Sequence, residues 1–192
     1  MALTRADLMS LEEYSEQRDI FRTRVIAHKK NRQVFLGPHA TLYFEDAMTM
    51  QYQIQEMLRI EKIFVAAEIE EELSAYNPLI PDGSNWKATF MIEYPDAEER
   101  REALAKMGGV EDTVWVRIGN GDKIHAIANE DLDRTRDEKA AAVHFMRFEI
   151  PAEDIAQAKA GAAITMGVAH PALGYETELD TAIAQSLVGD FA

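Results

Sequence analysis

Two glutamates, Glu61 and Glu68, stand seven residues apart in a segment whose apolar residues follow a helical period. At about 100° per residue, both project into the centre of one apolar arc. A carboxylate among core residues needs a cation, a metal ion or hydrogen-bond donors, because an unpaired buried charge is costly. The spacing therefore indicates metal or acid–base chemistry, structural ion pairs, or contacts to a ligand or partner. The arc contains Met50, Ile54, Met57, Leu58, Phe64, Val65 and Ile69.

Metal binding by these glutamates would need further ligands. Carboxylate-bridged di-iron bundles take them from Glu-x-x-His pairs on facing helices. None of the five histidines follows a glutamate by three residues. The sequence therefore favours ion pairs over a metal site, and we predict no bound metal and no resident cofactor.

A second helical segment supplies cations at the matching interval. It runs from Leu11 to about Asn31, and its apolar face also carries Arg22 and Lys29, which are seven residues apart. An antiparallel pairing of the two helices would bring each cation beside one glutamate in a single register. We predict ion pairs Arg22–Glu68 and Lys29–Glu61, which would specify the register more than they stabilise the fold.

The same region offers an alternative, a pocket for a metal ion or small anion between the long helix and a sheet. Glu56, Arg59 and Glu61 are close in sequence, and the planar guanidinium of Arg59 would orient an anionic group. His39 and His170 each stand beside a proline in a predicted loop, where ligand-binding side chains are often presented. These five residues are the candidate ligand-binding residues, and we assign no catalytic role to any residue.

Positive charge is concentrated near the N-terminus. Residues 1–32 carry seven Lys/Arg and five Asp/Glu, which leaves a net charge of −16 on the remaining 160 residues. Cations near the end of a helix are favoured by the helix dipole, which is the preferred explanation of this basic cluster; the alternative is a docking surface for an acidic partner. The candidate partner-binding residues are Arg18, Arg24, Lys30 and Arg32.

The elements around these residues predict an α+β fold. A long N-terminal helical hairpin, formed by residues 11–31 and 47–75, is expected to pack with a mainly antiparallel sheet of about five strands and short helices. Two short extended pieces, 33–36 and 41–45, lie between the long helices. The second helix contains no Gly or Pro and exceeds the usual globular length, which indicates a spanning core helix or a dimerisation helix.

The second half of the chain contains short runs rich in β-branched and aromatic residues, separated by turn residues. A Pro- and Gly-containing stretch predicts a boundary between a helical part, 1–76, and a sheet part, 77–192, unless the two form one continuous domain. Short helices are expected after Asp96, Pro151 and Thr177. The predicted strands are 86–94, 113–118, 123–128, 142–150 and 163–168.

Composition excludes several classes of function. The 192 residues include no cysteine, so disulfides, thiolate catalysis and cysteine-ligated zinc or iron–sulfur clusters are excluded from this chain. The net charge of −14 disfavours nucleic-acid binding, because a polyanion is repelled by a surface of the same sign. No segment reaches about 18 consecutive apolar residues, so we predict no membrane span and a cytoplasmic protein.

Four segments together resemble an uncharacterised bacterial family, domain of unknown function three-five-zero-one. They are RTRVIAHKKNRQVFLGPHATLYFED, TMQYQIQEMLRIEKI, VHFMRFEI and GVAHPALGY. The resemblance covers nearly the whole chain and supplies no established activity or catalytic residue. Members of such families are often encoded near rubrerythrin-like proteins and iron–sulfur oxidoreductases, so the resemblance implies a link to peroxide or redox defence.

Two functions therefore compete. The first is a cytoplasmic accessory or binding protein, expected to be a homodimer, that acts through a rubrerythrin-like or iron–sulfur partner protein. The lack of cysteine would make this chain the docking subunit and not the electron carrier. The second is an enzyme that binds a metal or small anion in the pocket described above.

Overall fold

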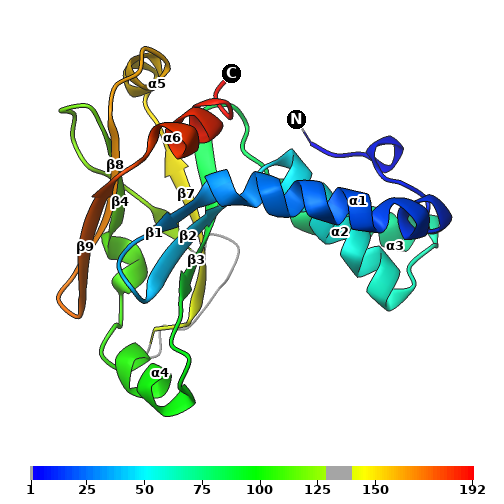
Figure 1. Cartoon of the computed structure of the whole chain (residues 1–192), viewed down its shortest axis with the longest axis horizontal. Helices are drawn as coiled ribbons and strands as arrows, with labels where there is room; N and C mark the ends of the chain where they lie inside the picture. The colour runs from blue at the N-terminus through cyan, green and yellow to red at the C-terminus, as the bar shows by residue number, and fades with distance from the viewer. Residues whose placement is uncertain (1, 129–139) are drawn as a thin grey trace.

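A computed structural model describes residues 2–128 and 140–192. Within them the chain forms an α+β fold of six α-helices and two antiparallel sheets (Figure 1). The helices are α1 (Leu11–Lys29), α2 (Ala47–Glu61), α3 (Ala66–Tyr76), α4 (Ala97–Leu104), α5 (Ala152–Lys159) and α6 (Thr181–Val188). The strands are β1 (Gln33–Phe35), β2 (Ala40–Phe44), β3 (Asn85–Ile92), β4 (Val114–Ile118), β5 (Ile124–His125), β6 (Ile127–Ala128), β7 (Val143–Glu149), β8 (Ile164–His170) and β9 (Leu173–Glu178).

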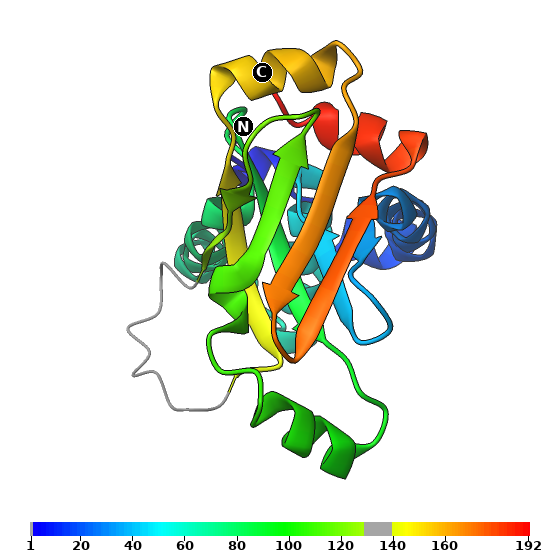
Figure 2. The same cartoon turned by 90° about the vertical axis from the view of Figure 1, so that its left-hand side faces the viewer.

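The two sheets pack face to face. One has the order β1-β2-β3-β7-β6 and the other β5-β4-β8-β9, with every neighbouring pair antiparallel. Figure 2 shows the four-stranded sheet in front of the five-stranded one. Alternate residues of the strands face inward, as the period of two requires. Trp86, Phe90, Phe148, Val116 and Met166 therefore share one buried cluster between the sheets.

The predicted antiparallel pairing is confirmed, but the strands form two sheets of five and four strands instead of one sheet of about five. The predicted strand 123–128 divides at Ala126, where β5 stays with β4 while β6 pairs with β7 in the other sheet. The Ala126 N–H donates to the carbonyl of Val114 (2.9 Å), which holds the chain where it changes sheets. The predicted extended pieces 33–36 and 41–45 became β1 and β2, full members of the five-stranded sheet.

We call α1, α2 and α3 the helical arm, because they project together from one side of the sheets (Figure 1). Ser10 caps α1, and its side chain accepts from the Glu13 N–H. The hydrophobic contact between α1 and α2 includes Tyr14, Phe21 and Tyr52, with edge-on packing of their rings. This contact fixes how the two helices lie against each other.

The single long helix predicted for residues 47–75 is two helices. α2 ends at Glu61. The next residue, Lys62, has a left-handed backbone (φ 56°), and the Ile63 N–H donates to the Leu58 carbonyl (2.9 Å). The break turns α3 back so that Leu73 packs against Ile54 and Leu58. This apolar burial outweighs the cost of about 1–2 kcal/mol for a left-handed non-glycine residue. The break carries no Gly or Pro to signal it in the sequence.

No helix in residues 2–128 and 140–192 is both long and apolar enough to cross a bilayer.

Candidate functional site

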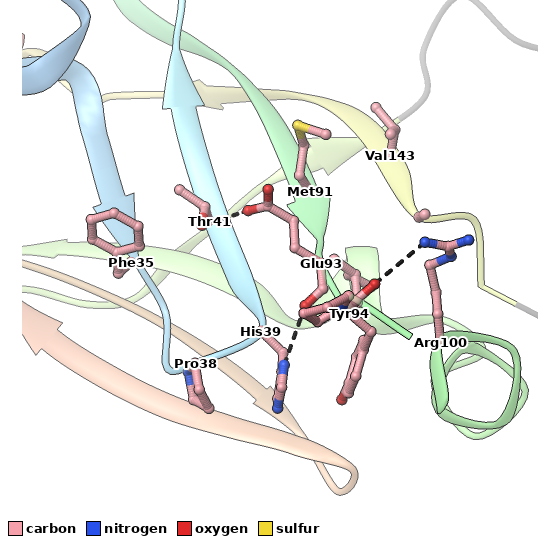
Figure 3. Close-up of a pocket in the computed structure, with 12 residues that line it drawn as sticks. Phe35, Pro38, His39, Thr41, Met91, Glu93, Tyr94, Arg100 and Val143 are labelled. Carbon is pink, nitrogen blue, oxygen red and sulfur yellow. Dashed lines mark hydrogen bonds between the residues drawn. The ribbon is translucent and has the colours of Figure 1, made fainter. Parts of the chain in front are cut away.

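An open cleft of about 740 Å³ lies where four segments of the chain converge at one end of the five-stranded sheet (Figure 3). The segments are the β1–β2 connection, the end of β3 with the residues after it, α4, and the start of β7. The lining residues are Phe35, Pro38, His39, Thr41, Met91, Ile92, Glu93, Tyr94, Pro95, Arg100, Ala142 and Val143.

The floor of the cleft is a row of side chains on the outer face of the sheet. Strand register places Phe35 opposite Thr41, Thr41 opposite Met91, and Met91 opposite Val143. Phe35 is 62% exposed, an unusual state for a phenylalanine in a sheet. The floor therefore offers an apolar surface to a ligand.

The Glu93 carboxylate places a negative charge beside the floor of the cleft. Its Oε2 accepts from the hydroxyls of Thr41 (3.0 Å) and Tyr43 (3.3 Å). Burial and the neighbouring Glu93 charge raise the pKa of Tyr43, so this phenol stays a hydrogen-bond donor at neutral pH. No Lys, Arg or His nitrogen in the described part of the chain lies within 4.0 Å of the Glu93 carboxylate.

His39 and Tyr94 form another wall. Their rings stack with centroids 4.0 Å apart and planes 9° from parallel. His39 Nδ1 lies 3.2 Å from the Glu93 carbonyl oxygen. A carbonyl only accepts, so Nδ1 carries a proton and donates in this contact. Gly37, in the loop just before His39, has a left-handed backbone (φ 84°) that favours glycine. It lies against the Tyr175 side chain.

Arg100 supplies a positive charge from α4. Asp96 caps this helix by accepting from the N–H groups of Glu98 and Glu99. The cap fixes the start of α4 and therefore the backbone position of Arg100. Arg100 Nη1 donates to the Tyr94 carbonyl (3.3 Å), as Figure 3 shows. Across the described ranges, no carboxylate lies within 4.0 Å of its guanidinium. The cleft thus combines an apolar floor with one acid and one base that are not paired.

Of the residues proposed as ligands from the sequence, His39 lines this cleft and Glu56, Arg59, Glu61 and His170 do not. His170 stands at the β8–β9 hairpin, where its Nδ1 accepts from the Ala172 N–H (3.2 Å). The cleft contains no α2 residue, so it differs from the expected pocket between the long helix and the sheet.

Glu56 is instead the centre of a charge cluster between α1 and α2. Arg18 donates to both of its oxygens (2.7 and 2.9 Å), Tyr14 donates to Oε1 (2.6 Å), and Arg59 lies 3.1 Å away. Hydrogen bonds from Arg18, then from Arg59 and Tyr14, lower the pKa of Glu56 to about 2. Burial and this carboxylate raise the pKa of Tyr14. Glu56 is therefore a structural anion.

The predicted pairs Arg22–Glu68 and Lys29–Glu61 are absent from the ion pairs of residues 2–128 and 140–192. The helices are antiparallel, but Arg18 meets Glu56 and His28 meets Asp46. The residue numbers of both observed pairs add up to 74, whereas those of the predicted pairs add up to 90. The apolar contact of Tyr14 and Phe21 with α2 sets this register, and the break at Lys62 redirects Glu68.

The proposed basic docking surface is divided by the fold. Arg18 is committed to Glu56, and Arg32 is buried, with only 2% of its surface exposed. Arg24 and Lys30 are exposed. Only two of the four predicted partner-binding residues therefore present a free guanidinium or ammonium at the surface.

Arg32 joins the arm to the sheets and to α6. Its guanidinium donates to Asp190 Oδ2 (2.6 Å) and to the carbonyls of Phe44 (3.1 Å) and Glu45 (3.0 Å). Burial raises the pKa of Asp190, against the lowering effect of Arg32. Burial also acts to raise the pKa of Asp46, but the Arg32 charge, 3.4 Å away, and other donors lower it overall.

Sequence reasoning missed Phe35, Glu93, Tyr94 and Arg100. The only signal for the cleft was the loop position of His39 beside Pro38. Within the described residues, no group of three or more His, Asp or Glu side chains is arranged to hold a metal ion.

A family model described as "Protein of unknown function (DUF3501)" matches residues 2–191. The chain belongs to this family. The resemblance noted from the sequence is thereby confirmed, and the match includes every residue of the cleft. No curated protein matches the sequence.

A solved structure shares this family member's fold along its full length. It is a crystal structure of a novel protein of unknown function from Burkholderia pseudomallei, 49% identical in sequence. The alignment covers 100% of each chain with a TM-score of 0.95. The arrangement of sheets and helical arm is therefore similar to one observed by crystallography.

Proposed function

We propose that this protein is a non-catalytic binding protein whose cleft holds a ligand with an apolar body and polar ends. One observation carries the proposal: polar groups from separate segments converge around a floor of exposed apolar side chains. Ligand sites in proteins characteristically combine a concave apolar surface with a few placed polar groups. The 740 Å³ of the cleft falls within the usual range for such sites.

The apolar floor is tested with the fluorescent probe 1-anilinonaphthalene-8-sulfonate. Phe35→Ser is expected to reduce probe binding several-fold, because Phe35 lines the cleft and is 62% exposed. Phe64→Ser is the matched control, since Phe64 is 74% exposed but lies on the helical arm. Equal effects of the two substitutions, or a larger effect at Phe64, would overturn the proposed binding site.

A second candidate function is an accessory protein that docks a partner in redox or peroxide defence. Phe145 and Ile127 are exposed large apolar residues on the outer face of the same sheet. Phe145 pairs with Thr89 in the row next to the cleft floor, so the apolar surface continues across β7. This continuity supports a protein partner, and the family resemblance suggests a rubrerythrin-like or iron–sulfur protein.

Purified rubrerythrin-like and iron–sulfur proteins from the same genome would test this docking by calorimetry. Phe145→Ser is expected to weaken binding about tenfold, whereas Phe64→Ser leaves it unchanged. If neither protein binds at low salt, the redox link is rejected. We further propose a cytoplasmic homodimer that uses the exposed apolar residues Ile20 and Ile60 of the arm. Sedimentation of wild-type protein and Ile60→Ser tests the dimer.

A further inference from the structure

We propose that the cleft recognises a zwitterion whose ammonium and carboxylate groups stand at opposite ends of an apolar body, such as an ω-amino acid. Glu93 would bind the ammonium group, Arg100 the carboxylate, and Met91 and Val143 of the floor the apolar body. The inference rests on the proposed binding function and names the chemical class of its ligand. It is based on two opposite charges, Glu93 and Arg100, which line one cleft and have no opposite charge beside them among the described residues.

The Glu93 carboxylate is oriented but not neutralised. Both hydroxyl donors, Thr41 and Tyr43, are directed to Oε2, and Oε1 accepts no hydrogen bond from the described residues. Hydroxyl donors hold a carboxylate in place without cancelling its charge. A ligand ammonium group supplies what Oε1 lacks, because charge-assisted hydrogen bonds are about twice as strong as neutral ones.

The Arg100 guanidinium is likewise oriented by a hydrogen bond but not neutralised. It donates from Nη1 to the Tyr94 carbonyl, which anchors one corner of the fork. Arginine carries five N–H donors, so four remain after this bond. The planar fork matches the geometry of a carboxylate, which makes arginine a common recognition residue for this group.

The two charges are kept apart by their own anchors. Glu93 is held on the sheet face by residues of β2, and Arg100 is held by the backbone at Tyr94; the two do not form an ion pair. In Figure 3 the Glu93 carboxylate points toward Thr41, and the Arg100 guanidinium approaches from the other side of Met91 and Tyr94. Between them runs the apolar row that includes Met91 and Val143. A zwitterion with an apolar body between its two charged ends complements all three features at once.

Three probes separate the charges: 6-aminohexanoate carries both, hexylamine only the cation, and hexanoate only the anion. Titration calorimetry of the full chain is expected to show 6-aminohexanoate binding about tenfold tighter than either singly charged probe, equal to about 1.4 kcal/mol. Arg100→Gln should lower 6-aminohexanoate affinity to that of hexylamine and leave hexylamine unchanged. Glu93→Gln should lower it to that of hexanoate and leave that probe unchanged.

Matched controls lie on the same helix. Arg101 pairs with Glu98 and does not line the cleft, and Glu99 is exposed outside it, so Arg101→Gln and Glu99→Gln should leave all three affinities unchanged. Circular dichroism confirms that each variant is folded.

The inference is overturned if the three probes bind equally, if one singly charged probe binds best, or if none binds. It is also overturned if Glu93→Gln and Arg100→Gln act no differently from their controls. These failures leave the proposed function standing as long as Phe35→Ser still reduces binding of the naphthalenesulfonate probe more than Phe64→Ser. If that difference is missing, the proposed function itself fails.

Discussion

Glu56 on the helical arm and Glu93 in the cleft are both carboxylates that accept a hydrogen bond from a tyrosine hydroxyl, yet their partners differ. Glu56 is also bound by two guanidinium groups, from Arg18 and Arg59, and its pKa falls to about 2. Glu93 accepts only from hydroxyls, and no cation of the described residues is within 4.0 Å. The first anion is used to join two helices, and the second remains available for a ligand.

The same contrast applies to the arginines. Arg32 is buried at the junction of arm and sheets and bonded to Asp190, whereas Arg100 stands at the edge of the cleft and is held by one carbonyl. The paired charges of Glu56 and Arg32 therefore connect elements of the fold. Oriented but unpaired charges mark the candidate site.

The largest effect is expected where the paired charges are buried. Arg32→Met would leave the largely buried carboxylate of Asp190 without its cation and remove one of the two partners of Asp46, so we expect a loss of about 3–5 kcal/mol in the free energy of unfolding. Urea denaturation measures it. Arg24→Met, at an exposed position of α1, is the control and should change the stability by less than about 0.5 kcal/mol. If Arg32→Met lowers the free energy of unfolding no more than Arg24→Met does, the conclusion that the Arg32 charge connects the arm to the sheets is contradicted.

The charge cluster of the arm should give an intermediate effect. Glu56→Gln keeps an acceptor for Tyr14 but removes the charge that binds Arg18 and Arg59. Hydrogen bonds to charged groups contribute about 1.5–3 kcal/mol, so we expect a loss of about 2 kcal/mol. Thermal or urea unfolding at neutral pH provides the measurement. Glu68→Gln is the comparison, because Glu68 is exposed and forms no ion pair in the described structure.

The Glu56 effect should also depend on pH. The pKa of Glu56 in the folded protein, about 2, lies below its ordinary value of 4.5. Its contribution is therefore fully present above about pH 5 and is lost as the pH falls toward 2. The stability difference between wild-type protein and Glu56→Gln should shrink when denaturation at about pH 6 is compared with about pH 3. A constant difference would show that the charge is not responsible.

The smallest effect on stability is expected in the cleft. Glu93→Gln and Arg100→Gln each remove a charge that has no countercharge, and both residues are exposed. Each should change the free energy of unfolding by less than about 0.5 kcal/mol. Urea denaturation with Glu99→Gln as the control checks this. A loss above about 1 kcal/mol at either position would place these residues with the structural charges of the arm.

Much of the fold followed from local pattern. Runs rich in β-branched and aromatic residues located β3, β4, β7 and β8, because these side chains fit the pleated surface of a strand. The capping residue Ser10 likewise located the start of α1. These features depend on neighbours in the chain, so the sequence contains them in full.

The register and the cleft could not be obtained in this way. Arg22 and Lys29 match Glu68 and Glu61 in spacing, but spacing alone does not state how far one helix slides along the other. Packing of Tyr14 and Phe21 against α2 decided the register of the two helices. The turn at Lys62 exists because it lets α3 bury Leu73, an effect of contacts distant in sequence.

The sequence by itself determined the fold class, most helices and strands, the exclusion of cysteine chemistry and the family. Each of these depends on composition or on residues close together in the chain. Only the tertiary structure decided which charges are neutralised. Glu56, Glu61 and Glu93 are alike as residues, and what distinguishes them is which cations and hydroxyls packing brings within a few ångströms of each carboxylate.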